Sequence, residues 1–176
     1  MSVAAIAIDN FLDTSKWNTI QADISGYLNA PLYSENRTSL HTDINSWIKD
    51  KLSSLGLWNN LWEDEIKLFS SINVLPKNID VECSDPTNGG YHREDGGYIY
   101  YIHPEWDPVW GGQLKFKNCS VEEIDPKPNR FVWVNPDIWH GIKVVYHEAQ
   151  TNRVTVVAWP TGTVEYPSAD IVINTL

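Results

Sequence analysis

The chain has 176 residues, the size of one domain that can bury a hydrophobic core. Its formal net charge of -10 argues against a nucleic-acid backbone as partner. No apolar run approaches the roughly 20 residues of a membrane span, and no targeting signal opens the chain, so we expect a cytoplasmic protein without a membrane partner. Cys83 and Cys119 lack metal-type spacing and are expected to be reduced thiols.

The N-terminal part of the chain contains two helical patterns. Residues 3–8 are apolar and predict either a short strand or the start of a helix, because periodicity does not separate the two. Residues 14–28 have apolar side chains at helical spacing, and the polar residues 13–15 are candidates for the N-cap. Residues 42–55 predict the second helix, with one apolar face. The alternation over residues 66–74 favours a half-buried strand.

Beyond Pro76 the sequence predicts short strands separated by turns, a pattern typical of an all-β sandwich or barrel. About eight such strands suit a jelly roll, in which two sheets enclose a pocket. We therefore expect one domain over residues 1–176, mainly β with N-terminal helices (α+β). Residues 1–75 would form a helical support and residues 76–170 a double-stranded β-helix. The predicted strands are residues 79–83, 90–94, 98–103, 112–117, 130–134, 141–146, 153–159 and 163–166.

Three potential metal ligands occur in the β-rich part. His92 and Glu94 are two residues apart, so their side chains project to the same side of an extended strand. With His140 from a distant strand they would form a two-His, one-carboxylate facial triad, which leaves coordination positions open on ferrous iron. Asp95 is the alternative carboxylate, because a one-residue distortion of the strand would present it instead. The two-residue spacing favours Glu94.

A cation follows the distal histidine. Arg153 begins the strand after His140, where it could meet a dicarboxylate inside the barrel through a bidentate pair. Thr155 lies on the same face of that strand by alternation. Taken alone, an arginine at a strand start is more often a surface residue. The functional interpretation therefore depends on the order of these features along the chain.

This ordered set resembles the iron(II)- and 2-oxoglutarate-dependent oxygenases, in particular their prolyl 4-hydroxylase-like branch. In that family a His-x-Asp/Glu pair precedes a Tyr-Tyr-Leu strand, a Trp-containing turn, a Gly-Gly, a Pro, a distal His and an Arg or Lys. The resemblance covers roughly residues 75–160. The matching segments are His92-Arg93-Glu94, Ile99-Tyr100-Tyr101-Ile102, Pro104-Glu105-Trp106-Asp107, Trp110-Gly111-Gly112, Asp125-Pro126, Trp139-His140 and Arg153-Val154-Thr155.

The resemblance implies a dioxygenase that uses iron(II) and 2-oxoglutarate to hydroxylate its substrate, with ascorbate as a further candidate cofactor. The facial triad would hold the iron. Arg153 would bind the 5-carboxylate of 2-oxoglutarate, assisted by the Tyr101 hydroxyl. Thr155 is a weaker candidate for the same site.

The same resemblance favours a peptidyl proline as substrate, with a free amino acid or another small molecule as the alternative. Two other classes fit the pattern. One is a cupin-like metal enzyme that does not use 2-oxoglutarate, and the other is a non-catalytic jelly-roll domain that binds carbohydrate or peptide. The connection over residues 95–98 is shorter than is usual in the family, so substrate specificity does not follow from the resemblance. The sequence gives no indication of the oligomeric state.

Overall fold

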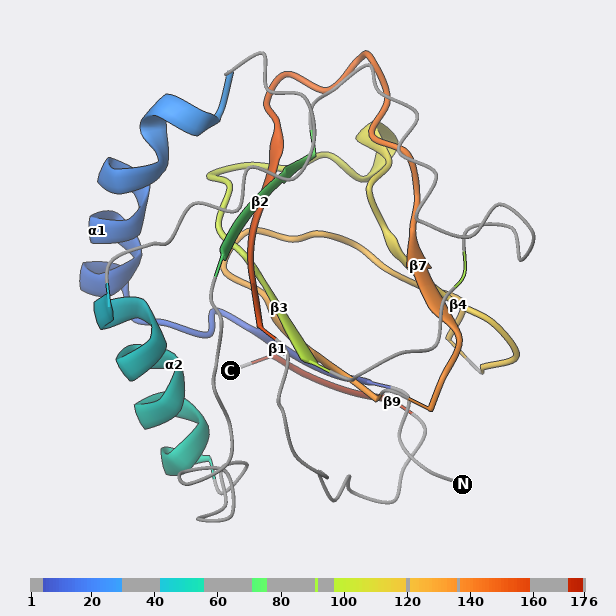
Figure 1. Ribbon diagram of the computed structural model, residues 1–176, viewed down its shortest axis with the longest axis horizontal. Helices are drawn as coiled ribbons and strands as arrows, with labels where there is room; N and C mark the ends of the chain where they lie inside the picture. Colours follow the sequence, from blue (N-terminus) through green and yellow to red (C-terminus); the bar gives the residue numbers. More distant parts are fainter. Residues whose placement is uncertain are drawn as a thin grey trace.

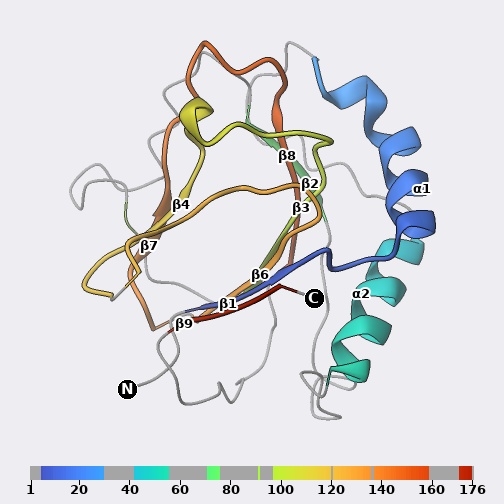
Figure 2. The same cartoon turned by 180° about the vertical axis from the view of Figure 1, so that it is seen from behind.

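The structure is a computed structural model that describes residues 5–29, 42–55, 71–75, 91, 97–119, 121–135, 137–158 and 171–175. A six-stranded sheet forms its centre. Helices α1 (Thr14–Ile24) and α2 (Thr42–Ser54) cover one face of this sheet, and a three-stranded sheet faces the other (Figure 1; Figure 2 from behind). Neither helix of the described residues combines the length and apolar character needed to cross a bilayer.

The strands of both sheets pair mostly in antiparallel fashion. The six-stranded sheet has the order β2-β8-β3-β6-β1-β9, in which the pair β1–β9 is parallel. The three-stranded sheet has the order β5-β4-β7. The bounds are β1 Ala5–Asp9, β2 Ser71–Leu75, β3 Gly97–Tyr101, β4 Leu114–Phe116, β5 Glu123–Ile124, β6 Phe131–Val134, β7 His140–Ile142, β8 Arg153–Ala158 and β9 Ile171–Thr175; the 3-10 turns are η1 Ser25–Tyr27 and η3 Pro108–Trp110.

Alternation along the strands divides the core into two layers. On β3, Tyr98 and Tyr100 belong to the cluster that packs under the helices, whereas Tyr101 belongs to the cluster between the two sheets. On β8, Val154 and Val156 face the helices. Side chains at the odd positions of β8 therefore face the three-stranded sheet.

The two predicted helices are confirmed. Helix α1 begins after Asp13, whose carboxylate accepts a hydrogen bond from the Lys16 N–H at 3.0 Å, as expected of an N-cap. Helix α2 buries Ile44, Ile48 and Leu52 on one face. Residues 3–8, which the sequence left between strand and helix, contain β1. This strand pairs on both sides and is buried on both faces, so its apolar run does not alternate.

Most of the predicted strands that the structure describes are confirmed, with shifted ends, whereas Tyr91, the described residue of the prediction over residues 90–94, does not lie in a strand. Strands β3, β4, β6, β7 and β8 correspond to the predictions that begin at residues 98, 112, 130, 141 and 153, and β2 overlaps the prediction over residues 66–74. The predictions over residues 79–83 and 163–166, and most of 90–94, lie outside the described residues. Strands β5 and β9 were not predicted. The six-stranded sheet takes in β1 and β2 from the predicted helical support, and β9 lies beyond the predicted core.

A buried carboxylate ties the end of β1 to the turn before β6. Arg130 donates to Asp9 through Nε (2.5 Å, to Oδ1) and Nη2 (3.1 Å, to Oδ2), and Lys127 Nζ donates to Oδ2 at 2.7 Å. Burial by itself raises the pKa of Asp9, but the hydrogen bonds and charges of the two cations outweigh it and hold the pKa below its usual value. Asp9 is therefore ionised in the folded protein at neutral pH.

Candidate active site

Arg153 is completely buried at the start of β8 and faces the three-stranded sheet. Its Nε–H donates to the Gly112 carbonyl at 3.0 Å, its Nη2–H donates to the Tyr101 hydroxyl at 3.4 Å, and the guanidinium carbon lies 4.9 Å from the centre of the Tyr101 ring. Within the described part of the chain no carboxylate forms an ion pair with Arg153. Burying a guanidinium without a counter-ion costs roughly several kcal/mol of folding free energy. The surroundings of Arg153 therefore suit the binding of an acidic ligand.

Tyr101 and Thr155 lie directly opposite each other on β3 and β8, and both are completely buried. They share a face with Arg153 because directly paired residues and residues two apart on one strand point to the same side. The prediction that Arg153 and Thr155 lie on the same face of their strand is thus confirmed. Since a guanidinium can only donate, the Tyr101 oxygen accepts, and its own hydrogen can be donated to a ligand. Burial raises the pKa of Tyr101, opposed by the charge of Arg153, so the phenol stays protonated.

Two glycines allow the close approach that encloses Arg153. Gly111 and Gly112 have φ of 79° and 72°, in the left-handed region that favours glycine. A Cβ on Gly111 would lie 2.1 Å from the Val144 carbonyl oxygen, and a Cβ on Gly112 would lie 3.0 Å from Arg153 Cδ. The Gly-Gly segment before β4 therefore lets the backbone contact both the β7 side of the fold and the arginine.

His103 is a buried residue of the site that the sequence analysis did not select. Its Nε2 lies 2.6 Å from the Pro126 carbonyl oxygen, and its Nδ1 accepts a hydrogen bond from the Val154 N–H at 3.3 Å. Burial, with a smaller effect of the Arg153 charge, outweighs the opposing hydrogen bonds and lowers the pKa of His103 to about 4. The imidazole is therefore neutral, with its hydrogen on Nε2. The sequence did contain one signal for a buried His103, namely its position directly after the apolar run 98–102.

His140 lies on β7, opposite Phe116 of β4, and is 8% exposed. Its Nδ1 lies 2.7 Å from the Ile138 carbonyl oxygen. Because a carbonyl can only accept, Nδ1 carries the hydrogen and Nε2 carries the lone pair that a metal ion requires. The donor chemistry of His140 therefore fits a metal ligand.

The other predicted ligands, His92, Glu94 and Asp95, lie outside the described residues. No cluster of three His, Cys, Asp or Glu side chains suited to a metal occurs among the residues that are described, which include His140 alone of the predicted ligands. The geometry of the facial triad thus stays a prediction.

Two other polar side chains near these strands, Lys143 and His147, have surface partners. Lys143 forms an ion pair with Glu123, which raises the pKa of the lysine. His147 is largely exposed and lies 3.0 Å from Glu148. Neither combines charge with the burial of Arg153, so Arg153 is the stronger candidate for an acidic ligand.

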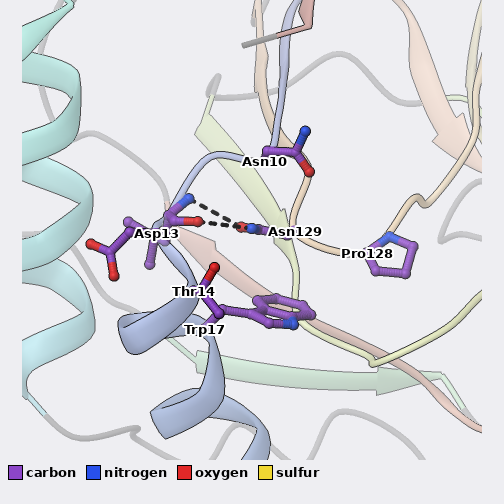
Figure 3. A pocket seen from close by; sticks show the side chains of 7 residues that line it. Asn10, Asp13, Thr14, Trp17, Pro128 and Asn129 are labelled. Carbon is purple, nitrogen blue, oxygen red and sulfur yellow. Dashed lines mark hydrogen bonds between the residues drawn. The ribbon is translucent and has the colours of Figure 1, made fainter.

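A pocket of about 450 Å³ lies at the start of α1, beside Trp17 and Pro128 (Figure 3). Asn129 at its edge exchanges hydrogen bonds with the Leu12 backbone at 3.1 and 2.9 Å, and Asp13 caps the helix. Asn129 also accepts from Tyr100, which faces the helices. The pocket therefore belongs to the helix-covered side of the sheet, opposite to Arg153.

Residues 78–161 match the model of the 2OG-Fe(II) oxygenase superfamily. This segment contains every residue that the sequence predicted for the site and the strands from β3 to β8. No curated protein sequence is significantly similar to the chain.

Solved structures resemble most of the chain at low sequence identity. A prolyl-4-hydroxylase from Pseudomonas putida superposes with a TM-score of 0.58 at 14% identity, over 92% of this chain and 94% of that one. A prolyl hydroxylase from Trichoplax adhaerens, solved in complex with a hypoxia inducible factor oxygen degradation domain peptide fragment, gives 0.55 at 17% identity, over 90% and 83%. A 2OG-Fe(II) oxygenase family oxidoreductase from Burkholderia pseudomallei gives 0.53 at 11%, over 90% and 84%. These likenesses establish a common fold.

Proposed function

We propose that this chain is a dioxygenase of the 2OG-Fe(II) oxygenase superfamily and that it hydroxylates a prolyl residue of a peptide or protein. The family implies iron(II) and 2-oxoglutarate. The observation that carries the cosubstrate assignment is Arg153, a buried cation without a carboxylate partner in the described part of the chain. Use of 2-oxoglutarate separates this function from that of a cupin-like metal enzyme.

In this proposal the chain is a single oxygenase domain whose two sheets form a double-stranded β-helix. The arrangement of the two mainly antiparallel sheets supports this fold, because they face each other across the cluster of buried apolar residues that includes Tyr101. The helices close the outer face of the larger sheet. The likeness to prolyl hydroxylases over most of both chains supports the same arrangement.

The proposed iron ligands are His92, Glu94 and His140, with Asp95 as the alternative to Glu94. The Nδ1–H of His140 donates to the Ile138 carbonyl, which holds the ring in the tautomer that binds metal through Nε2. When bound, the iron supplies the redox chemistry that couples decarboxylation of 2-oxoglutarate to hydroxylation of the substrate.

Arg153 and Tyr101 would bind the 5-carboxylate of 2-oxoglutarate. The guanidinium supplies charge, and the phenol supplies a hydroxyl hydrogen, since the Tyr101 oxygen already accepts from Arg153. Both groups are buried, so their hydrogen bonds to a carboxylate would form away from competing water. The Thr155 hydroxyl, opposite Tyr101, is the weaker third candidate.

Arg153→Ala tests the cosubstrate site. We expect it to retain iron and to raise the 2-oxoglutarate concentration for half-maximal succinate formation by roughly 10- to 100-fold, or about 1.4 to 2.8 kcal/mol. Arg153→Lys should fall between, because lysine keeps the charge but loses the planar fork. Lys143→Ala is the control, since its surface partner is Glu123. An unchanged 2-oxoglutarate dependence in Arg153→Ala, with circular dichroism of the wild type, would exclude this role.

The peptidyl substrate is tested by mass spectrometry. Iron-loaded protein with 2-oxoglutarate is incubated with a proteome of the native host and with its small-molecule fraction, and Arg153→Ala protein serves as the control. We expect additions of one oxygen atom on prolyl residues in the wild-type reaction, reduced with the variant. Additions confined to free amino acids or other metabolites would replace the prolyl proposal by its alternative.

A further inference from the structure

We propose that His103 is a positioning residue of the cosubstrate site, because its imidazole fixes the backbone at the start of β8 and thereby places Arg153. This inference rests on the proposed function, in which Arg153 binds the 5-carboxylate of 2-oxoglutarate. It adds a role for a side chain that has no predicted contact with iron or cosubstrate.

The ladder between β3 and β8 is interrupted at the position that His103 occupies. Ile102 N–H donates to the Val154 carbonyl at 3.0 Å, which makes these two residues a hydrogen-bonded antiparallel pair. Such a pair normally exchanges both bonds. Here the Ile102 carbonyl instead accepts from Gln21 Nε2 of α1 at 2.8 Å, and the Val154 N–H donates to His103 Nδ1. The imidazole thus takes the place of a backbone carbonyl in the ladder.

The bond from Val154 acts directly on Arg153. The Val154 N–H belongs to the peptide unit that joins the two residues, so its direction sets where the Arg153 side chain leaves the backbone. With its carbonyl held by Ile102 and its N–H held by His103, Val154 is fixed on both sides of its Cα. The position of the Arg153 backbone in turn decides whether its guanidinium reaches the Gly112 carbonyl and the Tyr101 hydroxyl, to which it donates hydrogen bonds.

The imidazole is in turn held by its surroundings. Its Nε2–H donates to the carbonyl of Pro126, in the connection between β5 and β6. The ring lies 4.6 Å from the Trp106 ring, and Trp106 Nε1 donates to the Gly111 carbonyl at 3.1 Å. A Cβ on Gly112 would lie 3.2 Å from the Trp106 ring and 3.0 Å from Arg153 Cδ. His103, Trp106 and the glycine pair therefore pack against one another beside the arginine.

The imidazole must accept one hydrogen bond, from the Val154 N–H, and donate one, to the Pro126 carbonyl. The lowered pKa of His103, about 4, keeps it in this neutral form at ordinary pH. A protonated ring could not accept from Val154, and it would add a second positive charge beside Arg153. Glutamine is the replacement that keeps one acceptor and one donor, whereas leucine keeps volume and loses both.

The test compares His103→Leu and His103→Gln in the full chain loaded anaerobically with iron(II). We expect His103→Leu to bind 2-oxoglutarate about 10-fold more weakly by titration calorimetry, with stoichiometric iron retained, since a freed backbone N–H relaxes the strand start. His103→Gln should restore most of the affinity. Asn129→Ala is the matched control, because it removes side-chain hydrogen bonds on the helix-covered face, to Leu12 and Tyr100. It should lower the melting temperature and leave 2-oxoglutarate affinity unchanged.

Wild-type affinity in a folded His103→Leu protein, with or without a lower melting temperature, would reduce His103 to a structural residue and overturn the inference. If His103→Leu does not fold, His103→Asn, whose shorter side chain cannot span both partners, must show weaker 2-oxoglutarate binding than His103→Gln; equal affinities would also overturn it. The proposed function fails separately, if wild-type protein does not bind 2-oxoglutarate or if Arg153→Ala binds it equally well.

Discussion

Replacement of His140 by alanine is expected to abolish stoichiometric iron binding. Its imidazole is nearly buried, and the Ile138 carbonyl holds it in the tautomer that offers Nε2 to a metal. A facial triad has three protein ligands, so loss of one removes a third of the protein donors and leaves the site without its distal histidine. His92→Ala should have the same effect. The measurement is iron content after anaerobic reconstitution and desalting.

His147→Ala is the matched control for this experiment, because His147 is exposed and its partner is Glu148. It should bind as much iron as the wild type. Retained stoichiometric iron in His140→Ala would remove His140 from the metal site. The same assay ranks the carboxylates: Glu94→Ala should be far more damaging than Asp95→Ala, and the reverse order would make Asp95 the ligand.

Local signals in the sequence predicted much of the framework. The Asp13 cap and the apolar spacing of α1 and α2 are contained within each helix, so neighbouring residues suffice to predict them. Alternation along β8 was enough to put Arg153 and Thr155 on one face. The order of motifs along the chain then predicted a resemblance to this family, and residues 78–161 match the family's model.

The features that were not predicted depend on distant partners. β1 is buried on both faces because Ile6 and Ile8 pack under the helices while Ala5 and Ala7 pack between the two sheets, and its apolar run alone is equally compatible with a helix. β5 has two residues, too few to show alternation. His103 has no acidic neighbour at ligand spacing and acquires its role from Val154 and Pro126, at sequence separations of 51 and 23 residues.

Among the residues whose role depends on partners distant in the sequence, Asp9 has the largest expected effect on stability. Asp9→Ala is expected to lower the free energy of unfolding by about 3 to 5 kcal/mol at pH 7, because it removes the buried carboxylate that pairs with the largely buried guanidinium of Arg130. Arg130, whose side chain is 12% exposed, accounts for most of this loss. Lys127 is half-exposed and can return to water, so its contribution is small. Urea unfolding followed by circular dichroism gives the value.

The acid dependence of unfolding separates this ion pair from a loss of packing. The pKa of Asp9 is lowered in the folded protein, so its stabilisation is fully present above the unfolded pKa, near 4, and is lost as pH falls through the lower folded value. The difference in unfolding free energy between wild type and Asp9→Asn should therefore shrink on acidification below about pH 4. Asp13→Asn is the control, since asparagine also caps helices and the Asp13 side chain is 57% exposed. A wild-type advantage over Asp9→Asn that stays constant into acid, or one no larger than that over Asp13→Asn, would mean that the carboxylate charge does not hold β1 to Arg130.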